Sequence, residues 1–343
     1  MIVDCAHYKD GHRADEGKVP LAEIADRRAQ GGFVWLGLFE PGEEELTQVR
    51  DIFGLHELAV EDALTLHRHP KLVTYDGVQL VIMRTARYDD EEEEVDFGEI
   101  SVFVAPTFVI TVRQGVATDL TGVRQRLQER PELLAAGSSS ALWAVLDAVV
   151  DSYAPVVLEV ERDVDDIEAT VFSGSIAPTE RIYSLRGEAT GFYRAVHPLL
   201  AVITTAERTA PPELQPYLRD VHDHLIRVDE GIADQRELLR QVLEANMAVI
   251  SVEQTRVSVQ QNRTMQQLTI LATIVLPLTF ITGFFGQNFG WLVDHVKSLP
   301  AFLIYGIGGL VVPLVLLITW MRLRMPHVDT RAAAGEAART GQP

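Results

Sequence analysis

Side chains able to contact a cation recur along one side of a mainly apolar segment. From Asn262 to Gly286, positions alternately three and four apart carry mostly small or hydrogen-bonding side chains, whereas the opposite side is branched and apolar. Residues three and four apart lie on the same face of a helix, so these positions form one seam. The seam comprises Asn262, Met265, Thr269, Ala272, Leu276, Thr279, Gly283 and Gly286.

Two interpretations of this seam remain open. In the first, its small residues allow the helix to pack closely against a second apolar helix at residues 302–321, which contains three glycines suited to close approach. In the second, the seam lines a water-filled path, and Asn262, Thr269 and Thr279 supply oxygen acceptors to an ion. Since two helices cannot enclose a pore, the second interpretation requires several chains around a common axis.

The absence of charge indicates which ion would suit such a path. Residues 268–285 and 302–321 contain no Asp, Glu, Lys or Arg, although pumps and proton-coupled exchangers usually keep an ionisable side chain within the membrane. An ion would instead meet hydroxyl, backbone and amide oxygens, such as those of Gln287 and Asn288. These hard ligands favour a strongly hydrated divalent cation such as Mg²⁺ over a soft transition metal.

Both apolar segments are about as long as a helix needs to cross a bilayer, which predicts a membrane protein. Arginines precede the first segment and follow the second, whereas the short loop between them contains a single basic residue, Lys297. Because positive flanks remain inside, we expect a multi-pass hairpin in the inner membrane with both termini cytoplasmic. Residues 1–13 contain no apolar segment of signal-peptide type, so we expect no export of the N-terminal part.

The composition is that of a large water-exposed body attached to a small membrane part. The 343 residues are 47% hydrophobic with a mean hydropathy of only +0.08, and Cys5 is the single cysteine, which excludes an internal disulfide framework. The net charge of -19 argues against nucleic acid as a partner, because phosphate backbones are bound by Lys and Arg. Such a surface concentrates cations, or it simply keeps the protein soluble.

Strand and helix patterns predict four regions. Residues 1–139 alternate β-rich runs with helical stretches, which predicts a cytoplasmic α/β domain. We then expect a cytoplasmic stalk of long helices at 140–263, a two-helix transmembrane pore domain at 264–325 and a cytoplasmic tail at 326–343. Strands are predicted at 32–38, 79–84, 100–104 and 108–112, and helices at 43–53, 118–134, 142–172, 179–209 and 213–285.

Two charged clusters outside the membrane segments have open interpretations. The acidic run at 89–96 lies between two predicted strands, which favours a solvated hairpin loop over a weak attraction for divalent ions. Asp220, Asp223 and His224 fall within one helical turn and could together ligate a metal ion, with His222 pointing elsewhere. Alternatively, these three residues form a solvated face of the stalk.

Several motifs resemble those of the CorA-type divalent-metal transporters. Residues 286–289 (Gly-Gln-Asn-Phe) resemble the family's Gly-Met-Asn signature, and residues 276–283 resemble the Pro-Leu-Thr segment that precedes it. Residues 54–71 are similar to the family's His-x-x-x-x-Glu-Asp block, and residues 151–168 are similar to its first long helix. The resemblance extends over nearly the whole chain.

The resemblance implies a CorA-like homopentameric funnel that admits Mg²⁺ or Co²⁺ through a central pore lined by the first membrane helix. Asn288 would offer five side-chain carbonyls to a hydrated ion at the mouth, and Leu276 and Met265 would form a hydrophobic constriction. Mg²⁺ is implied as the transported ion and, at a stalk segment that includes Asp220, as a regulatory ion, without an organic cofactor. The other pore positions carried over are Gly286, Thr279 and Asn262.

Departures from the family pattern leave two alternatives. Gln287 replaces the middle Met of the signature and could alter ion choice, while the external loop has Asp294 and His295 in place of a Met-Pro-Glu motif. The chain could therefore be a zinc transporter of the same family, with or without proton coupling, or a membrane-anchored metal sensor that does not conduct. An enzyme is not expected, because no nucleophile with a nearby base, phosphate loop or zinc-hydrolase spacing occurs.

Overall fold

The computed structural model describes residues 1–15, 17–67, 69–116, 120–287, 290–295 and 297–324. The chain divides into two compact units, of which the first is Met1–Ser251 and the second begins at Val252. Both units contain part of α9 (Gln215–Phe285), the longest helix among the described residues.

A mixed sheet of seven strands forms the centre of the first unit, in the order β2-β1-β3-β7-β6-β5-β4. Among the described strands, β3 and β7 are the one parallel pair, and the other neighbours are antiparallel. The strands are β1 (Ile2–Lys9), β2 (His12–Arg13), β3 (Phe33–Phe39), β4 (Lys71–Tyr75), β5 (Val78–Asp89), β6 (Glu94–Ala105) and β7 (Phe108–Gly115).

The four predicted strands correspond to β3, β5, β6 and β7, whereas β1, β4 and the two-residue β2 were not predicted. Both β1 and β4 contain charged residues that obscure a strand pattern: Asp4 interrupts β1, and Lys71 begins β4 at the edge of the sheet. The acidic run does form a hairpin, as expected. Its turn is short, however, because β5 continues to Asp89 and β6 resumes at Glu94.

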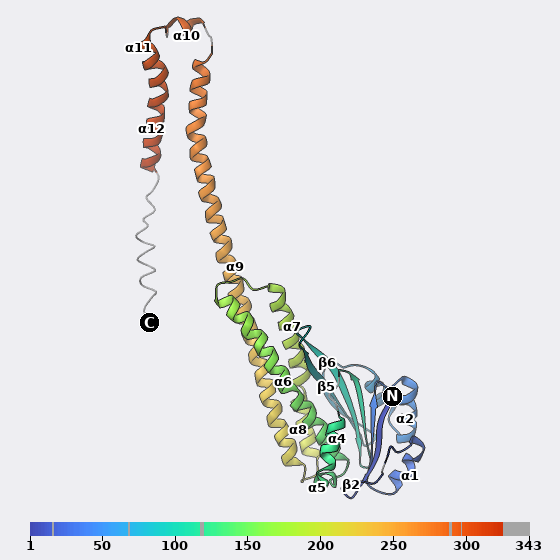
Figure 1. Ribbon diagram of the computed structural model, residues 1–343. Helices are drawn as coiled ribbons and strands as arrows, with labels where there is room; N and C mark the ends of the chain where they lie inside the picture. The colour runs from blue at the N-terminus through green and yellow to red at the C-terminus, as the bar shows by residue number, and fades with distance from the viewer. Residues whose placement is uncertain (16, 68, 117–119, 288–289, 296, 325–343) are drawn as a thin grey trace, which may run out of the picture. The chain divides into compact units, whose positions relative to one another are not determined.

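Both faces of the sheet are covered by helices, as Figure 1 shows. On β3, Val34, Leu36 and Leu38 belong to one core cluster and Phe33 and Trp35 to the other, as the two-residue period of a strand requires. The helices on the first side are α1 (Ile24–Ala29), α2 (Glu43–Phe53) and α3 (Glu57–Leu64). Burial on both faces explains why β3 is apolar at consecutive positions.

The second face packs against a helical layer dominated by α6 (Ser138–Phe172). This helix is long and apolar enough to cross a membrane, yet 61% of its most apolar window is buried inside the first unit. Tyr153 on α6 is fully buried, and its hydroxyl donates a hydrogen bond to the backbone carbonyl of Arg84 on β5. Helix α6 is thus a core helix of the first unit.

Two helices predicted as continuous are divided. The predicted helix at 179–209 consists of α7 (Thr179–Val196) and α8 (Leu199–Thr209), because Pro198 lacks the N–H that a continuous helix would need. Residues 118 and 119 of the predicted helix at 118–134 lie outside the described residues. The rest is divided into α4 (Thr121–Gln128) and α5 (Pro131–Leu134), with proline at the first position of α5.

In the second unit, the end of α9 is followed by α10 (Gly290–His295), α11 (Leu299–Ala301) and α12 (Gly309–Arg324). Helix α9 continues through Pro277, as predicted. The second apolar segment is less regular than predicted, because Phe302–Gly308 is a π-helical segment (η2). Two stretches, Gln215–Phe284 and Leu299–Trp320, are long and apolar enough to span a membrane, and none of their most apolar windows is buried.

Candidate functional site: the polar seam of helix α9

The seam predicted from the sequence lies on an exposed surface of α9. Leu276 and Met265 are 75% and 63% exposed, and Thr269 and Asn262 are exposed as well. A shallow hollow of about 390 Å³ is lined by Ala272, Leu276 and Thr279 of the seam together with Val275 and Phe280. The structure therefore brings the middle of the seam together on one open surface.

The opposite side of α9 packs against α12. A small cavity of about 170 Å³ is lined by Ile274, Leu278 and Ile281 of α9 and by Leu310 and Leu314 of α12. Figure 1 shows α12 running beside the last part of α9. The branched apolar side is thus the side that α12 covers, and the polar seam is left without a neighbour from the described part of this chain.

Two glycines of the second apolar segment, Gly306 and Gly308, lie against their own segment. A side chain built at Gly306 would meet Phe302 of its own segment, and one built at Gly308 would meet the carbonyl of Leu303. Gly283 on the seam faces open space. Gly306 and Gly308 therefore do not join the two helices of one chain, and the described contact between α9 and α12 is made by branched apolar side chains instead.

The seam threonines present acceptor oxygens to their surroundings. The Thr269 hydroxyl donates to the carbonyl of Met265 at 2.8 Å, and the Thr279 hydroxyl donates to the carbonyl of Val275 at 2.9 Å. A hydroxyl whose hydrogen is donated to its own helix keeps its lone pairs for another donor. Such an oxygen can accept a hydrogen bond from a water molecule in the shell of a cation.

The end of α9 carries the glycine of the predicted signature. The Gly286 N–H donates to the carbonyl of Thr282 at 2.9 Å, and the Gln287 N–H donates to the carbonyl of Phe284 at 3.3 Å. Both Gly286 and Gln287 are exposed. A helix C-terminus carries partial negative charge, which favours a cation at this end. Asn288 lies outside the described residues, and its predicted role remains a prediction.

An ion pair lies in the described part of the connection after α9. Asp294 and Lys297 form a salt bridge, while the His295 ring stacks on Trp291 with ring centroids 4.3 Å apart. The charge of Asp294, which stands in place of the family's acidic loop motif, is therefore partly neutralised by Lys297.

The predicted metal cluster on α9 is arranged differently from the expectation. His224 lies 3.8 Å from Asp220 and 3.5 Å from Asp151 on α6, whereas Asp223 is exposed. Burial and the charge of Asp151 raise the pKa of the nearby Asp147. Within the described residues no three His, Cys, Asp or Glu side chains form a set that could hold a metal ion.

Sequence reasoning did not include Asp147 and Asp151 in this cluster. Their spacing of four residues on an apolar helix was a usable signal, but pairing them with α9 requires knowledge of which helices are neighbours.

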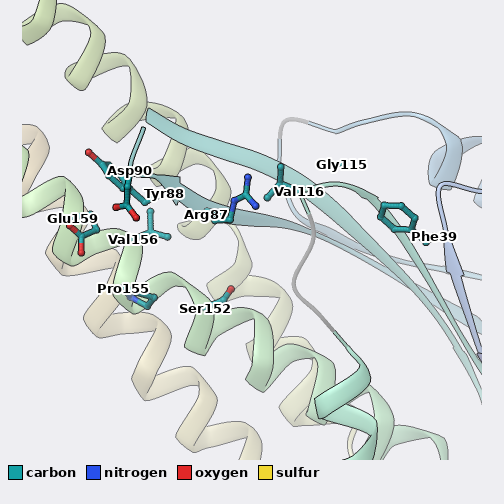
Figure 2. A pocket seen from close by; sticks show the side chains of 11 residues that line it. Phe39, Arg87, Tyr88, Asp90, Gly115, Val116, Ser152, Pro155, Val156 and Glu159 are labelled. Carbon is teal, nitrogen blue, oxygen red and sulfur yellow. The ribbon is translucent and has the colours of Figure 1, made fainter. Parts of the chain in front are cut away.

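A larger cavity of about 750 Å³ lies between α6 and the β5–β6 hairpin. Figure 2 shows Asp90 on the hairpin and Glu159 on α6 at one side of the view and Phe39 at the other side, with Arg87 in the middle. Arg87 pairs with Asp96 across the hairpin at 3.3 Å. The cavity is lined by residues of the hairpin, of α6 and of β3, and it includes none of the residues predicted for the pore or for the metal cluster on α9.

Two exposed apolar helices of membrane-spanning length, attached to an α/β unit, define a membrane protein. Residues 30–323 match the family described as CorA-like Mg²⁺ transporter protein, and the chain belongs to that family.

Similar proteins include a cobalt/magnesium transport protein CorA of Thermotoga maritima, 28% identical over 267 residues, with 76% of this chain and 74% of the relative covered. The putative metal ion transporter YfjQ of Bacillus subtilis is 27% identical over 265 residues, covering 76% of this chain and 80% of the relative.

Solved structures show the same fold. The full-length CmaX protein superposes with a TM-score of 0.62 at 20% identity, covering 94% of this chain and 98% of that one. The complete CorA magnesium transporter of Methanocaldococcus jannaschii gives a TM-score of 0.60 at 18% identity, covering 95% and 99%. The predicted combination of an α/β domain with long helices is thus confirmed.

Proposed function

We propose that this chain is a divalent cation transporter that passes Mg²⁺, and Co²⁺ as a further substrate, through a pore formed by several copies. The single observation that carries the proposal is the exposed seam of α9, since α12 covers the opposite, apolar side. A helix with acceptor oxygens on one open side is suited to line an aqueous path. Family membership and the names of the relatives support the ion class.

The pore in this proposal is a ring of α9 helices. Thr269 and Thr279 face the path with hydroxyl oxygens, whereas Leu276 and Met265 narrow it with apolar side chains. Asn262 lies at the inner end, and the C-terminus of α9 places partial negative charge at Gly286 near the mouth. The hairpin of α9 and α12 crosses the inner membrane, and both termini lie in the cytoplasm, as the arginine flanks predict.

Asn288 is proposed as the residue that holds the hydrated ion. Mg²⁺ dehydrates reluctantly, so an amide oxygen that accepts hydrogen bonds from its bound waters is a suitable partner. A ring of five chains is the expected assembly. A regulatory Mg²⁺ site in this proposal combines Asp220 and His224 with a further ligand, either Asp151 or a residue of a second copy.

The experiment is flux of Mg²⁺ and Zn²⁺ into liposomes containing the purified full chain, with and without a pH gradient, together with its mass in detergent. We expect Mg²⁺ entry that does not require the gradient and a mass of about five chains. Asn288→Ala should lose most flux while the mass is unchanged. Flux from a stable monomer, or unchanged flux in Asn288→Ala, would contradict the proposal.

Zinc transport is retained as a second candidate because Gln287 stands at an exposed position next to the proposed ion site. The same liposome measurement distinguishes zinc transport from Mg²⁺ transport, since Zn²⁺ entry that depends on the pH gradient would favour zinc transport.

A further inference from the structure

A proline lies inside each of the two helices that pack together in the second unit. Pro277 is an interior residue of α9, and Pro313 is an interior residue of α12. Proline has no N–H, so Pro277 cannot donate to the carbonyl of Thr273, and Pro313 cannot donate to the carbonyl of Gly309. Each helix therefore lacks one of the hydrogen bonds that keep a helix straight, and prolines are the usual place at which helices bend.

The two prolines lie at the same level of the hairpin. Both line the cavity of about 170 Å³ between α9 and α12. Figure 1 shows α12 beside the last part of α9. A bend in α9 at Pro277 therefore lies directly opposite a bend in α12 at Pro313, so the two helices can change direction together.

The cavity between the prolines supplies room for such a change. Packed helices normally leave few voids larger than a water molecule. Here the apolar side chains of Ile281 and Leu310 border an open volume of about 170 Å³ instead. Side chains on both helices can move into this volume, so the helices can tilt against each other without overlapping.

The part of the hairpin beyond the prolines is less regular than the part before them. Immediately before α12, Phe302–Gly308 is π-helical, and α12 itself begins with Gly309. Short π-helical segments often occur at functional sites. On α9, Gly283 faces open space. Neither side of this outer part is therefore held as firmly as a regular, closely packed helix pair.

We propose that Pro277 and Pro313 form one hinge, about which the outer part of the hairpin tilts to open the ion path at Leu276. Leu276 directly precedes Pro277 and is exposed on the seam. A change of direction at Pro277 moves Thr279 and the end of α9 relative to Leu276. The gating role rests on the proposed function, because Leu276 narrows a path only within a ring of α9 helices.

Pro313→Ala is the sharpest test, because Pro313 lies on α12 and outside the seam. The alanine N–H can donate to the carbonyl of Gly309, and this bond would have to break at each opening. We expect Mg²⁺ flux into liposomes to fall about fivefold with an unchanged mass in detergent, and Pro277→Ala should have a similar effect. Unchanged flux in Pro313→Ala would overturn the paired hinge.

Pro300→Ala is the matched control. Pro300 lies in the first turn of α11, where a proline N–H would have no partner within the helix. This variant should keep the flux of the wild type. A loss equal to that in Pro313→Ala would show that flux responds to any proline replaced in this part of the chain, and it would overturn the assignment.

A second pair of variants tests the cavity without altering a proline. Leu314→Phe places a larger side chain in the cavity, which should hinder the tilt and lower flux several-fold. Leu316→Phe makes the same change at an exposed position on α12, where the side chain is 64% exposed, and should leave flux unchanged. Equal flux in the two variants would contradict the role of the cavity.

The hinge itself is measured without ion flux. Spin labels on cysteines at Gln267 and Gln287 would lie about 30 Å apart along a straight helix, on either side of Pro277. Cys5 is buried, and labelled chains are diluted with unlabelled ones so that each assembly carries one labelled copy. We expect a narrower distribution of distances in Pro277→Ala than in the wild-type background. Equal widths would overturn the hinge, whereas narrowing in a chain that passes no Mg²⁺ would contradict the proposed function and the gating role but support the hinge.

Discussion

The Asn246 side chain makes two hydrogen bonds to one residue, Ala177. Its Oδ1 accepts from the Ala177 N–H at 3.1 Å, and its Nδ2 donates to the Ala177 carbonyl at 3.2 Å. Asn246 is fully buried on α9, whereas Ala177 lies in the turn between α6 and α7. The Asn246 side chain thereby attaches the turn to α9 and satisfies both the N–H and the carbonyl group of Ala177.

Replacing Asn246 with Ala should destabilise the first unit by about 1 to 3 kcal/mol, because two buried backbone groups lose their partner. Chemical unfolding of the full chain in detergent, followed by circular dichroism, measures this change. Gln241→Ala, which removes an exposed amide from α9, is the control and should change stability by less than about 0.5 kcal/mol. Equal stability of the two variants would show that the turn is held by other contacts.

Thr279→Val should reduce Mg²⁺ flux several-fold without changing the assembly. The substitution keeps the shape of the side chain but removes an oxygen that accepts hydrogen bonds from the ion's water shell. Thr319→Val is a matched control, since Thr319 on α12 makes the same bond to the carbonyl four residues earlier, at 2.7 Å. Liposome flux for both variants decides the matter, and a loss in Thr319→Val equal to that in Thr279→Val would count against the seam as the path.

Gln287→Met should leave the ratio of Mg²⁺ to Zn²⁺ flux unchanged while altering thermal stability. If the helical turn continues, position 287 lies about 100° around the axis from Gly286 and so points away from the seam. Competition between the two ions in the liposome assay gives the ratio. A several-fold shift, equivalent to about 1 kcal/mol from one hydrogen bond, would instead place the Gln287 amide in the selectivity site.

Glu99 should make the first unit less stable as the pH rises. This carboxyl on β6 is 1% exposed, and burial raises its pKa above the ordinary 4.5 despite a hydrogen bond from the His67 N–H at 2.6 Å. The folded state therefore holds the proton more tightly than the unfolded state. Its contribution to stability is complete below the unfolded pKa and is lost as the pH rises through the folded pKa.

The measurement is the difference in free energy of unfolding between the wild type and Glu99→Gln across that pH range. The wild type should lose stability relative to the variant as the pH rises from about 4.5 towards neutrality. Glu161→Gln on the exposed side of α6 should show no such trend. A difference that is independent of pH would mean that Glu99 is ionised at the same pH in both states.

Features that follow from local periodicity could be predicted from the sequence alone. The three-and-four spacing from Asn262 to Gly286 predicted a helix with one polar side, and the absence of a strong breaker before Pro277 predicted that α9 is continuous. Runs of β-branched residues likewise predicted four of the strands. Each such pattern depends only on which side chains of a single helix or strand are buried. The family motifs were equally local.

Features that depend on which helices and strands are neighbours could be known only from the folded structure. Residue spacing alone could not tell whether the seam of α9 or its apolar side faces α12. The cavity shared by Ile274, Leu278 and Leu310 shows that the apolar side faces α12. The folded structure likewise paired His224 with Asp151 rather than Asp223, and it placed Pro277 and Pro313 of two separate helices around one cavity. These contacts join residues far apart in the chain, so no local pattern contains them.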